Sequence, residues 1–202
     1  MKFKMRTSKI YLLFTLVTTF TLTSCNDFLD QQPDDRTELN SPVKVAELLA
    51  TAYPKANYIP FAEAMSDNAG DKGTTSRELE NSLPWTFEDN VAVNEDTPNY
   101  YWQGCYKGIA AANHALETIN NATDKKAYSA SKGEALVARA YSHFMLVTLF
   151  AKAYDPATAA SDPGIPYVTT PEKVVERKYE RNTVAYVYEQ IEKDLLEGLP
   201  LL

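Results

Sequence analysis

Residues 132–155, KGEALVARAYSHFMLVTLFAKAYD, predict a helix that is apolar around nearly its whole circumference. Charges interrupt the run at Glu134, Arg139 and Lys152. The uninterrupted apolar part is therefore shorter than the roughly 20 residues that a helix needs to cross a bilayer. A helix without a continuous polar face has to be covered on several sides. This stretch therefore predicts a central helix of a bundle, with Phe144 and Leu146 in the core.

A second stretch, residues 99–122, carries an apolar seam along one face that includes Trp102 and Cys105. Gly104 and Gly108 lie four residues apart in the same stretch. Each glycine costs up to about 1 kcal/mol of helix propensity relative to alanine. That cost is most simply explained if another helix packs closely against this side.

Two more helices are predicted at the two ends of the folded part. Ser41 is a good N-cap, Pro42 suits the first helical position, and apolar residues follow at helical spacing up to Tyr53. Near the C-terminus, residues 182–199 predict a helix with Asn182 or Thr183 as its N-cap and with glycine and proline at its end. Its apolar face is formed by Val184, Val187, Ile191 and Leu195.

The connections between these helices have the composition of loops. Residues 64–98 contain Gly, Asn, Asp, Ser and Pro in clusters without a sustained period, which predicts a long irregular loop. Residues 153–183 are punctuated by four X-Pro pairs, which predicts an extended connection with turns. The whole pattern predicts an all-α fold, a tetratricopeptide-like helical scaffold with long irregular loops.

The N-terminus has the layout of a bacterial lipoprotein signal peptide. Four basic residues precede Ile10–Leu22, a 13-residue run without charge. The run is too short and too rich in threonine to suit a permanent membrane span, which is the alternative interpretation. Leu22-Thr23-Ser24-Cys25 resembles the lipobox, in which the cysteine receives diacylglycerol and further acyl chains such as palmitate. We therefore predict a signal peptide over 1–24 and lipidation at Cys25.

Residues 25–40 are polar and predict a lipidated tether, which leads to a domain over 41–202. Removal of 1–24 leaves 16 basic against 27 acidic residues, a net charge of −11. Nucleic-acid binding requires clustered Lys and Arg, so the charge disfavours that class of partner. With Cys25 acylated, Cys105 is alone and no intrachain disulfide is expected.

No catalytic constellation stands out in the sequence. His114 and His143 lie inside helical stretches without a recognisable nucleophile motif beside them, so packing or a local hydrogen bond is the simpler role. Asp67 and Asp71 resemble a calcium loop only loosely, and a plain turn is preferred. We therefore predict no enzyme activity, no cofactor and no metal site.

The ordered set of motifs resembles the N-terminal part of the SusD/RagB family of Bacteroidetes outer-membrane lipoproteins. The resemblance rests on CNDFLDQQP after the lipobox, SPVKVAELLATAY, YYWQGCYKGIAAANHALE, GEALVARAYSHFMLVTLFAKAY, DPGIPYV and RNTVAYVYEQIEKDLLEGLP. It implies a tetratricopeptide-like scaffold at the cell surface that captures a nutrient, most often a glycan. It also implies association with a TonB-dependent transporter of the SusC type. Family members run well beyond position 202, so the resemblance covers an early portion.

Sugar binding requires flat aromatic faces and planar hydrogen-bonding side chains. Trp85 and Phe87 in the predicted loop, with Arg77 and Asn81 nearby, meet this requirement, because binding residues concentrate in loops. Tyr100 and Tyr101 at the start of the second long helix are further candidates, whereas Trp102 is expected in the core. The predicted ligand-binding residues are Trp85, Tyr101, Tyr100 and Arg77. The alternative is a truncated helical interaction scaffold without ligand affinity.

Overall fold

The computed structural model describes residues 38–70, 73, 78–89, 94–172 and 178–202. Within these ranges the chain is helical, and one isolated antiparallel bridge joins Pro163 to Thr183. The all-α prediction is confirmed. The α-helices are α3 (Pro42–Leu49), α4 (Ile59–Ala64), α5 (Glu78–Trp85), α6 (Pro98–Asn121), α7 (Ser129–Phe150) and α8 (Val184–Gly198), with 3-10 turns η1 (Lys125–Tyr128) and η2 (Leu199–Leu201).

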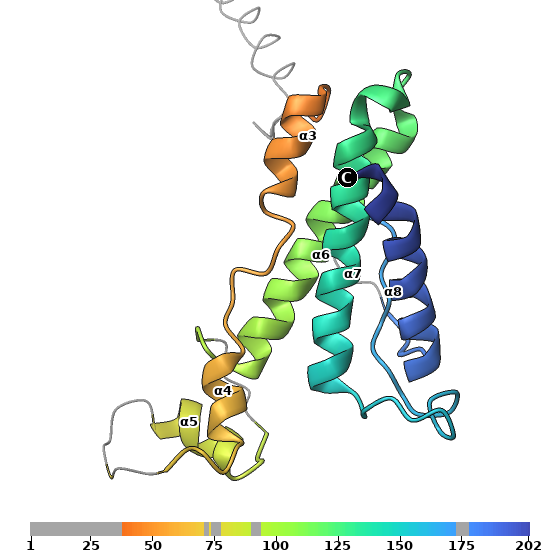
Figure 1. The fold of residues 1–202 in the computed structure, drawn as a ribbon. Coiled ribbons are helices and arrows are strands. Elements are labelled where there is room, and N and C mark those ends of the chain that lie inside the picture. The colour runs from red at the N-terminus through yellow and green to blue at the C-terminus, as the bar shows by residue number, and fades with distance from the viewer. Residues whose placement is uncertain (1–37, 71–72, 74–77, 90–93, 173–177) are drawn as a thin grey trace, which may run out of the picture. The chain divides into compact units, whose positions relative to one another are not determined.

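The helices α6, α7 and α8 lie side by side and α7 is in the middle of the three (Figure 1). Thr97 caps α6 by accepting a hydrogen bond from the amide of Tyr100, and Pro98 occupies the first turn. Only a few residues, including η1, connect α6 to α7, so the two helices run antiparallel. The interior combines small side chains such as Ala112 and Ala138 with larger ones such as Ile109 and Leu146.

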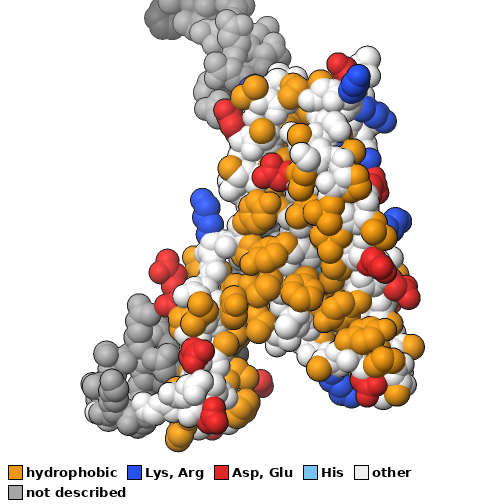
Figure 2. Space-filling view, viewed as in Figure 1, with side chains coloured by type: hydrophobic (Ala, Val, Ile, Leu, Met, Phe, Trp, Pro, Cys, Tyr) orange, Lys and Arg blue, Asp and Glu red, His pale blue; other side chains and the backbone are white. Residues whose placement is uncertain are grey.

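The prediction that α7 is central is confirmed, but its expected burial on all sides is not. Leu146 is fully buried, whereas Tyr141 and Phe144 are each 43% exposed. Figure 2 shows hydrophobic side chains gathered over the middle of the viewed face. The sequence shows that apolar residues lie all around the helix, but it does not show which of its faces another helix covers. Phe144 is therefore a surface residue of the described domain.

Gly104 and Gly108 do permit a close approach, chiefly by the segment after α3, while the Ser142 hydroxyl of α7 would lie 3.4 Å from a Cβ on Gly108. A Cβ atom on Gly108 would lie 2.7 Å from the carbonyl oxygen of Ala52, and one on Gly104 would lie 3.0 Å from Cβ of Ala56. Residues 52–56 follow α3 and are not helical. The predicted helix partner is therefore only partly right: α7 contacts Gly108, but the closest atoms belong to a non-helical segment, because the helix predicted up to Tyr53 ends at Leu49.

Thr183 is the cap of α8, since its hydroxyl accepts a hydrogen bond from the amide of Tyr186. The predicted apolar face is buried at Val184, Val187 and Ile191. Gly198 is the last residue of α8 and has an ordinary negative φ of −81°, so it is not a left-handed cap. A Cβ there would lie 2.9 Å from Cβ of Leu136, and Gly198 therefore lets α8 approach α7 closely.

The predicted irregular loop over 64–98 is wrong in part. Helix α5 lies inside it and packs against α4. Both helices are short, so neither carries a long apolar period, and α4 also packs Phe61 against Tyr101 of α6. The extended connection over 153–183 is confirmed in its described parts by turns near Asp155 and by the bridge at Pro163.

Candidate functional site

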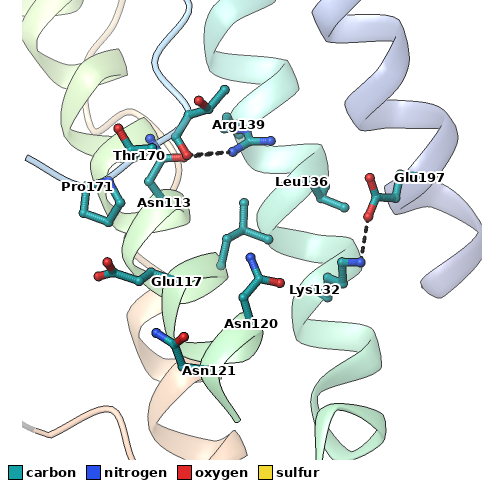
Figure 3. A pocket seen from close by; sticks show the side chains of 12 residues that line it. Asn113, Glu117, Asn120, Asn121, Lys132, Leu136, Arg139, Thr170, Pro171 and Glu197 are labelled. Carbon is teal, nitrogen blue, oxygen red and sulfur yellow. Dashed lines mark hydrogen bonds and ion pairs between the residues drawn. The ribbon is translucent and has the colours of Figure 1, made fainter.

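A groove of about 840 Å³ lies between the second half of α6 and the first half of α7 (Figure 3). Leu116 and Leu136 are its buried apolar residues. The ion pair between Lys132 and Glu197, at 2.6 Å, joins α7 to α8 beside it. None of the described residues that line this groove is aromatic, so it offers no stacking platform for a sugar; its polar residues are Asn113, Glu117, Asn120, Asn121, Lys132, Arg139, Thr169, Thr170 and Glu197.

Arg139 at the groove is the centre of a buried polar network. Its Nε and Nη2 atoms each donate to a carboxylate oxygen of Asp194, both at 2.7 Å. Its Nη1 donates to Oδ1 of Asn113 at 3.0 Å. Burial acts to lower the pKa of Arg139, but the Asp194 carboxylate outweighs this and the pKa is raised. The network therefore joins α6, α7 and α8 through the buried ion pair of Arg139 and Asp194.

Tyr167 and His143 extend the network to the connection before α8. The hydroxyl of Tyr167 lies 2.6 Å from Oδ2 of Asp194, to which it donates. Its ring stacks on the imidazole of His143, with centroids 3.8 Å apart and planes 17° apart. The Tyr167 pKa is raised, first by burial and then by the neighbouring carboxylate of Asp194. Tyr167 therefore remains a neutral hydrogen-bond donor.

The hydrogen bonds of His143 determine its tautomer. The amide of Val168 donates to Nε2 at 3.0 Å, so Nε2 carries no proton. Nδ1 lies 2.9 Å from the carbonyl oxygen of Arg139 and donates to it. Burial lowers the pKa of His143 to about 3, and the charge of Arg139 acts in the same direction. His143 is thus a neutral core residue, in agreement with the packing role predicted for it.

Cys105 also has the core role predicted for it. The side chain is fully buried, and burial raises the pKa of its thiol to about 12. A thiol in such surroundings is protonated and inert as a nucleophile. His114 is exposed on α6. The two histidines and the cysteine therefore form no described catalytic arrangement.

Trp85 is the last residue of α5 and is 54% exposed. Phe87 follows it with 71% exposure and a positive φ of 56°. The sequence placed Trp85 in an irregular loop, and the structure corrects this to a helix end. The exposed indole nevertheless offers the ring face that was predicted. Whether it contacts a ligand stays a prediction.

Tyr100 and Tyr101 have different environments. Tyr101 is 1% exposed and its ring packs edge-on against Tyr58 and Phe61, which leaves no open face for stacking. Its predicted role as a stacking platform is therefore wrong, because it falls on the buried face of α6. Tyr100 is half-buried and lines a pocket of about 320 Å³ that also includes Tyr53.

Other predicted residues lie outside the structural description. Arg77, Cys25 and the segments 1–24 and 25–37 fall outside the described residues, as does Asp71, and the side chain of Asn81 is not described. Among the described residues no group of three His, Cys, Asp or Glu side chains is placed to hold a metal ion. None of the helices in the described ranges is both long and apolar enough to cross a membrane.

The Arg139–Asp194 pair was not predicted, although the sequence carries a signal for it. Arg139 is a single charge in the middle of an apolar stretch, which requires a buried partner. Asp194 lies three residues after Ile191, on the apolar face of α8. A buried charge on each of two facing helices would have predicted the pair.

Comparison with known proteins gives one family and one fold. The SusD-like_3 family, described as starch-binding associating with outer membrane, matches residues 27–202. A SusD superfamily protein from Bacteroides thetaiotaomicron VPI-5482 is 25% identical, with a TM-score of 0.60, over 80% of this chain and 37% of its own. No curated protein matches significantly.

Two further solved structures share the fold. A laminarin binding SusD-like protein is 24% identical, with a TM-score of 0.62, over 81% of this chain and 34% of its own. A SusD superfamily protein from Bacteroides fragilis is 21% identical, with a TM-score of 0.62, over 81% of this chain and 40% of its own. The chain thus spans well under half the length of these three relatives. The family match over nearly the whole sequence shows that this chain belongs to the SusD-like family.

Proposed function

We propose that the protein is a surface-exposed, lipid-anchored subunit that binds a nutrient, most simply a glycan, for an importer. The family description, starch-binding associating with outer membrane, supports both the ligand class and the location. One structural neighbour is named as laminarin binding, which supports a glycan as the ligand. The lipobox at Cys25 supplies the anchor, because several acyl chains on one residue give stable attachment.

The partner in this proposal is a TonB-dependent transporter of the SusC type. Family resemblance supports this partner, and the acidic charge of the mature chain argues against nucleic acid. The protein binds its ligand without converting it. The neutral, buried state of His143 and the inert thiol of Cys105 support a role in binding, because neither group is available for catalysis.

The observation that carries the proposed site is the exposed indole of Trp85 at the end of α5. Arg77, which precedes α5 in the sequence, and Tyr100 complete the proposed ligand-binding set. An aromatic face open to solvent can stack on the C–H groups of a sugar while the indole N–H donates a hydrogen bond.

The test is calorimetric titration of the full chain, purified in detergent, with maltoheptaose and laminarihexaose, followed by chromatography of the sugar. Binding with recovery of intact sugar is expected. Recovery of shortened sugar would show an enzyme. Co-purification of a transporter from membranes without affinity for either sugar would favour the scaffold alternative.

A further inference from the structure

A third pocket is lined largely by tyrosines. It has a volume of about 250 Å³, somewhat less than the roughly 300 Å³ at which pockets for whole small-molecule ligands begin, so at most a small unit of a ligand fits. Its walls come from the segment after α3, from the start of α6 and from the middle of α7. The lining residues are Tyr53, Pro54, Ala56, Asn57, Tyr58, Tyr101 and Tyr141.

The walls of this pocket are held in place by close packing. Cβ of Ala56 lies where it leaves no room for a side chain at Gly104, so the segment 53–58 rests tightly on α6. The rings of Tyr53 and Tyr141 pair at a centroid distance of 6.3 Å, and those of Tyr58 and Tyr101 pair at 5.6 Å. The pocket is therefore formed before any ligand arrives, which lowers the entropic cost of binding.

The rings that open to solvent offer apolar faces. Tyr53 is 41% exposed, Tyr58 is 36% exposed and Tyr141 is 43% exposed. Each combines a flat ring, which accepts C–H groups, with a hydroxyl that both donates and accepts hydrogen bonds. A polyhydroxylated ring needs this combination, whereas a purely apolar ligand would leave the hydroxyls without partners.

The buried residue of the pocket has unused hydrogen-bonding capacity. Tyr101 is 1% exposed, and its hydroxyl has no oxygen or nitrogen partner among the described residues. The Cys105 thiol beside it is only a weak partner. Burial raises the pKa of Tyr101, and the neighbouring Cys105 thiol adds to the effect, with smaller contributions from Tyr141 and Tyr58. The Tyr101 hydroxyl therefore has hydrogen-bonding capacity that the oxygen and nitrogen atoms of the described residues do not use.

We infer that this tyrosine pocket is a second carbohydrate subsite, which takes one sugar unit of an oligosaccharide between Tyr53, Tyr58 and Tyr141. The inference rests on the proposed glycan function but not on the Trp85 site. Tyr53 also lines the pocket of about 320 Å³ that contains Tyr100, Gln103 and Lys107. Because the two pockets share Tyr53, the next unit of the same oligosaccharide occupies the neighbouring one.

The test compares the affinity of the full chain for maltoheptaose and laminarihexaose between wild type and single variants. Tyr141→Ala removes one exposed ring and is expected to weaken binding of the preferred sugar about ten-fold, by analogy with the loss of an aromatic stacking platform. Tyr141→Phe keeps the ring and is expected to lose less. Tyr186→Ala is the matched control, since Tyr186 is 40% exposed on α8 and does not line the pocket.

The outcomes separate this inference from the proposed function. If Trp85→Ala weakens sugar binding and Tyr141→Ala does not, the second subsite is wrong and the proposed function stands. If Tyr141→Ala weakens binding and Trp85→Ala does not, the tyrosine pocket is supported and the α5 site is wrong. Equal losses of sugar affinity in Tyr141→Ala and Tyr186→Ala would contradict the inference. It would also be contradicted if Tyr141→Ala kept its sugar affinity but no longer co-purified with the transporter. A wild-type chain that binds neither sugar would overturn both.

Discussion

Arg139 on α7 and Asp194 on α8 face each other with two parallel hydrogen bonds of 2.7 Å, and both side chains are at most 10% exposed. Such a pair has lost most of its hydration, so each charge depends on the other. Asp194 also accepts a hydrogen bond from Tyr167, and Arg139 donates one to Asn113. The ion pair thereby links α6, α7, α8 and the connection before α8.

Removal of one member of this pair is expected to be costly. Asp194→Ala leaves the guanidinium of Arg139 buried without a counter-ion, which should lower the free energy of unfolding by about 3–5 kcal/mol. Urea denaturation at neutral pH measures the change. Glu197→Gln is the control, because the ion pair of Lys132 and Glu197 is solvent-exposed and should contribute at most about 1 kcal/mol. Equal effects of the two variants would contradict the buried role.

The neutral state of His143 predicts acid sensitivity. Its pKa is lowered to about 3 in the folded chain, against about 6.5 when unfolded. The unfolded chain therefore binds the proton first as pH falls. The stabilisation is fully present above pH 6.5 and is lost progressively toward pH 3, by about 1.4 kcal/mol per pH unit within that window.

His143→Gln removes this titration and keeps a side chain that can accept from the Val168 amide. The variant is expected to be less stable than wild type at pH 7.5 but to lose less stability between pH 6.5 and pH 4.5. Urea denaturation at several pH values measures the slope. The same slope in both proteins would show that His143 does not contribute to it.

Core and surface positions of α7 should respond differently to truncation. Leu146 is fully buried, so Leu146→Ala is expected to lower the free energy of unfolding by about 2–5 kcal/mol. Phe144 is 43% exposed and touches Tyr188 edge-on at 6.3 Å, so Phe144→Ala should cost less than about 1.5 kcal/mol. Thermal melts of both variants test this, and a larger loss for Phe144→Ala would contradict the placement of α7.

Trp85→Ala tests the proposed α5 site. The exposed indole contributes little to the core, so the melting temperature should be nearly unchanged while sugar affinity falls by about 1–3 kcal/mol. Trp102→Ala provides the comparison, because Trp102 packs against Tyr106 and Phe150 at 5.1 Å and its loss should destabilise the fold. A large drop in melting temperature for Trp85→Ala would instead identify Trp85 as a structural residue.

Lipidation at Cys25 has a direct chemical test. Mass spectrometry of the membrane-extracted protein is expected to find an acylated peptide that begins at Cys25. Cys25→Ala should release the protein from membranes. A wild-type protein that fractionates as soluble would contradict the anchor.

The long helices were predictable because each carries its apolar residues at helical spacing over several turns. Thr183 and Ser41 were recognisable caps for the same reason, since the hydroxyl sits directly before an apolar period. Helix α5 was missed because it is short, carries no sustained apolar period and contains a proline, Pro84. Tyr101 was misassigned because adjacent tyrosines at a helix start look alike in sequence, and only packing shows that one of them lies inside.

Val168 is held on both of its backbone groups by side chains from two helices: its amide donates to His143, and its carbonyl accepts from Nδ2 of Asn113 at 3.0 Å. The residue belongs to no helix or strand. Its amide nevertheless becomes accessible to water only when the hydrogen bonds from α6 and α7 to its backbone break. In hydrogen–deuterium exchange this amide should therefore be among the last to exchange, as slow as those of the helix interiors. A connection without regular structure thus provides a probe for the cooperative opening of the whole domain.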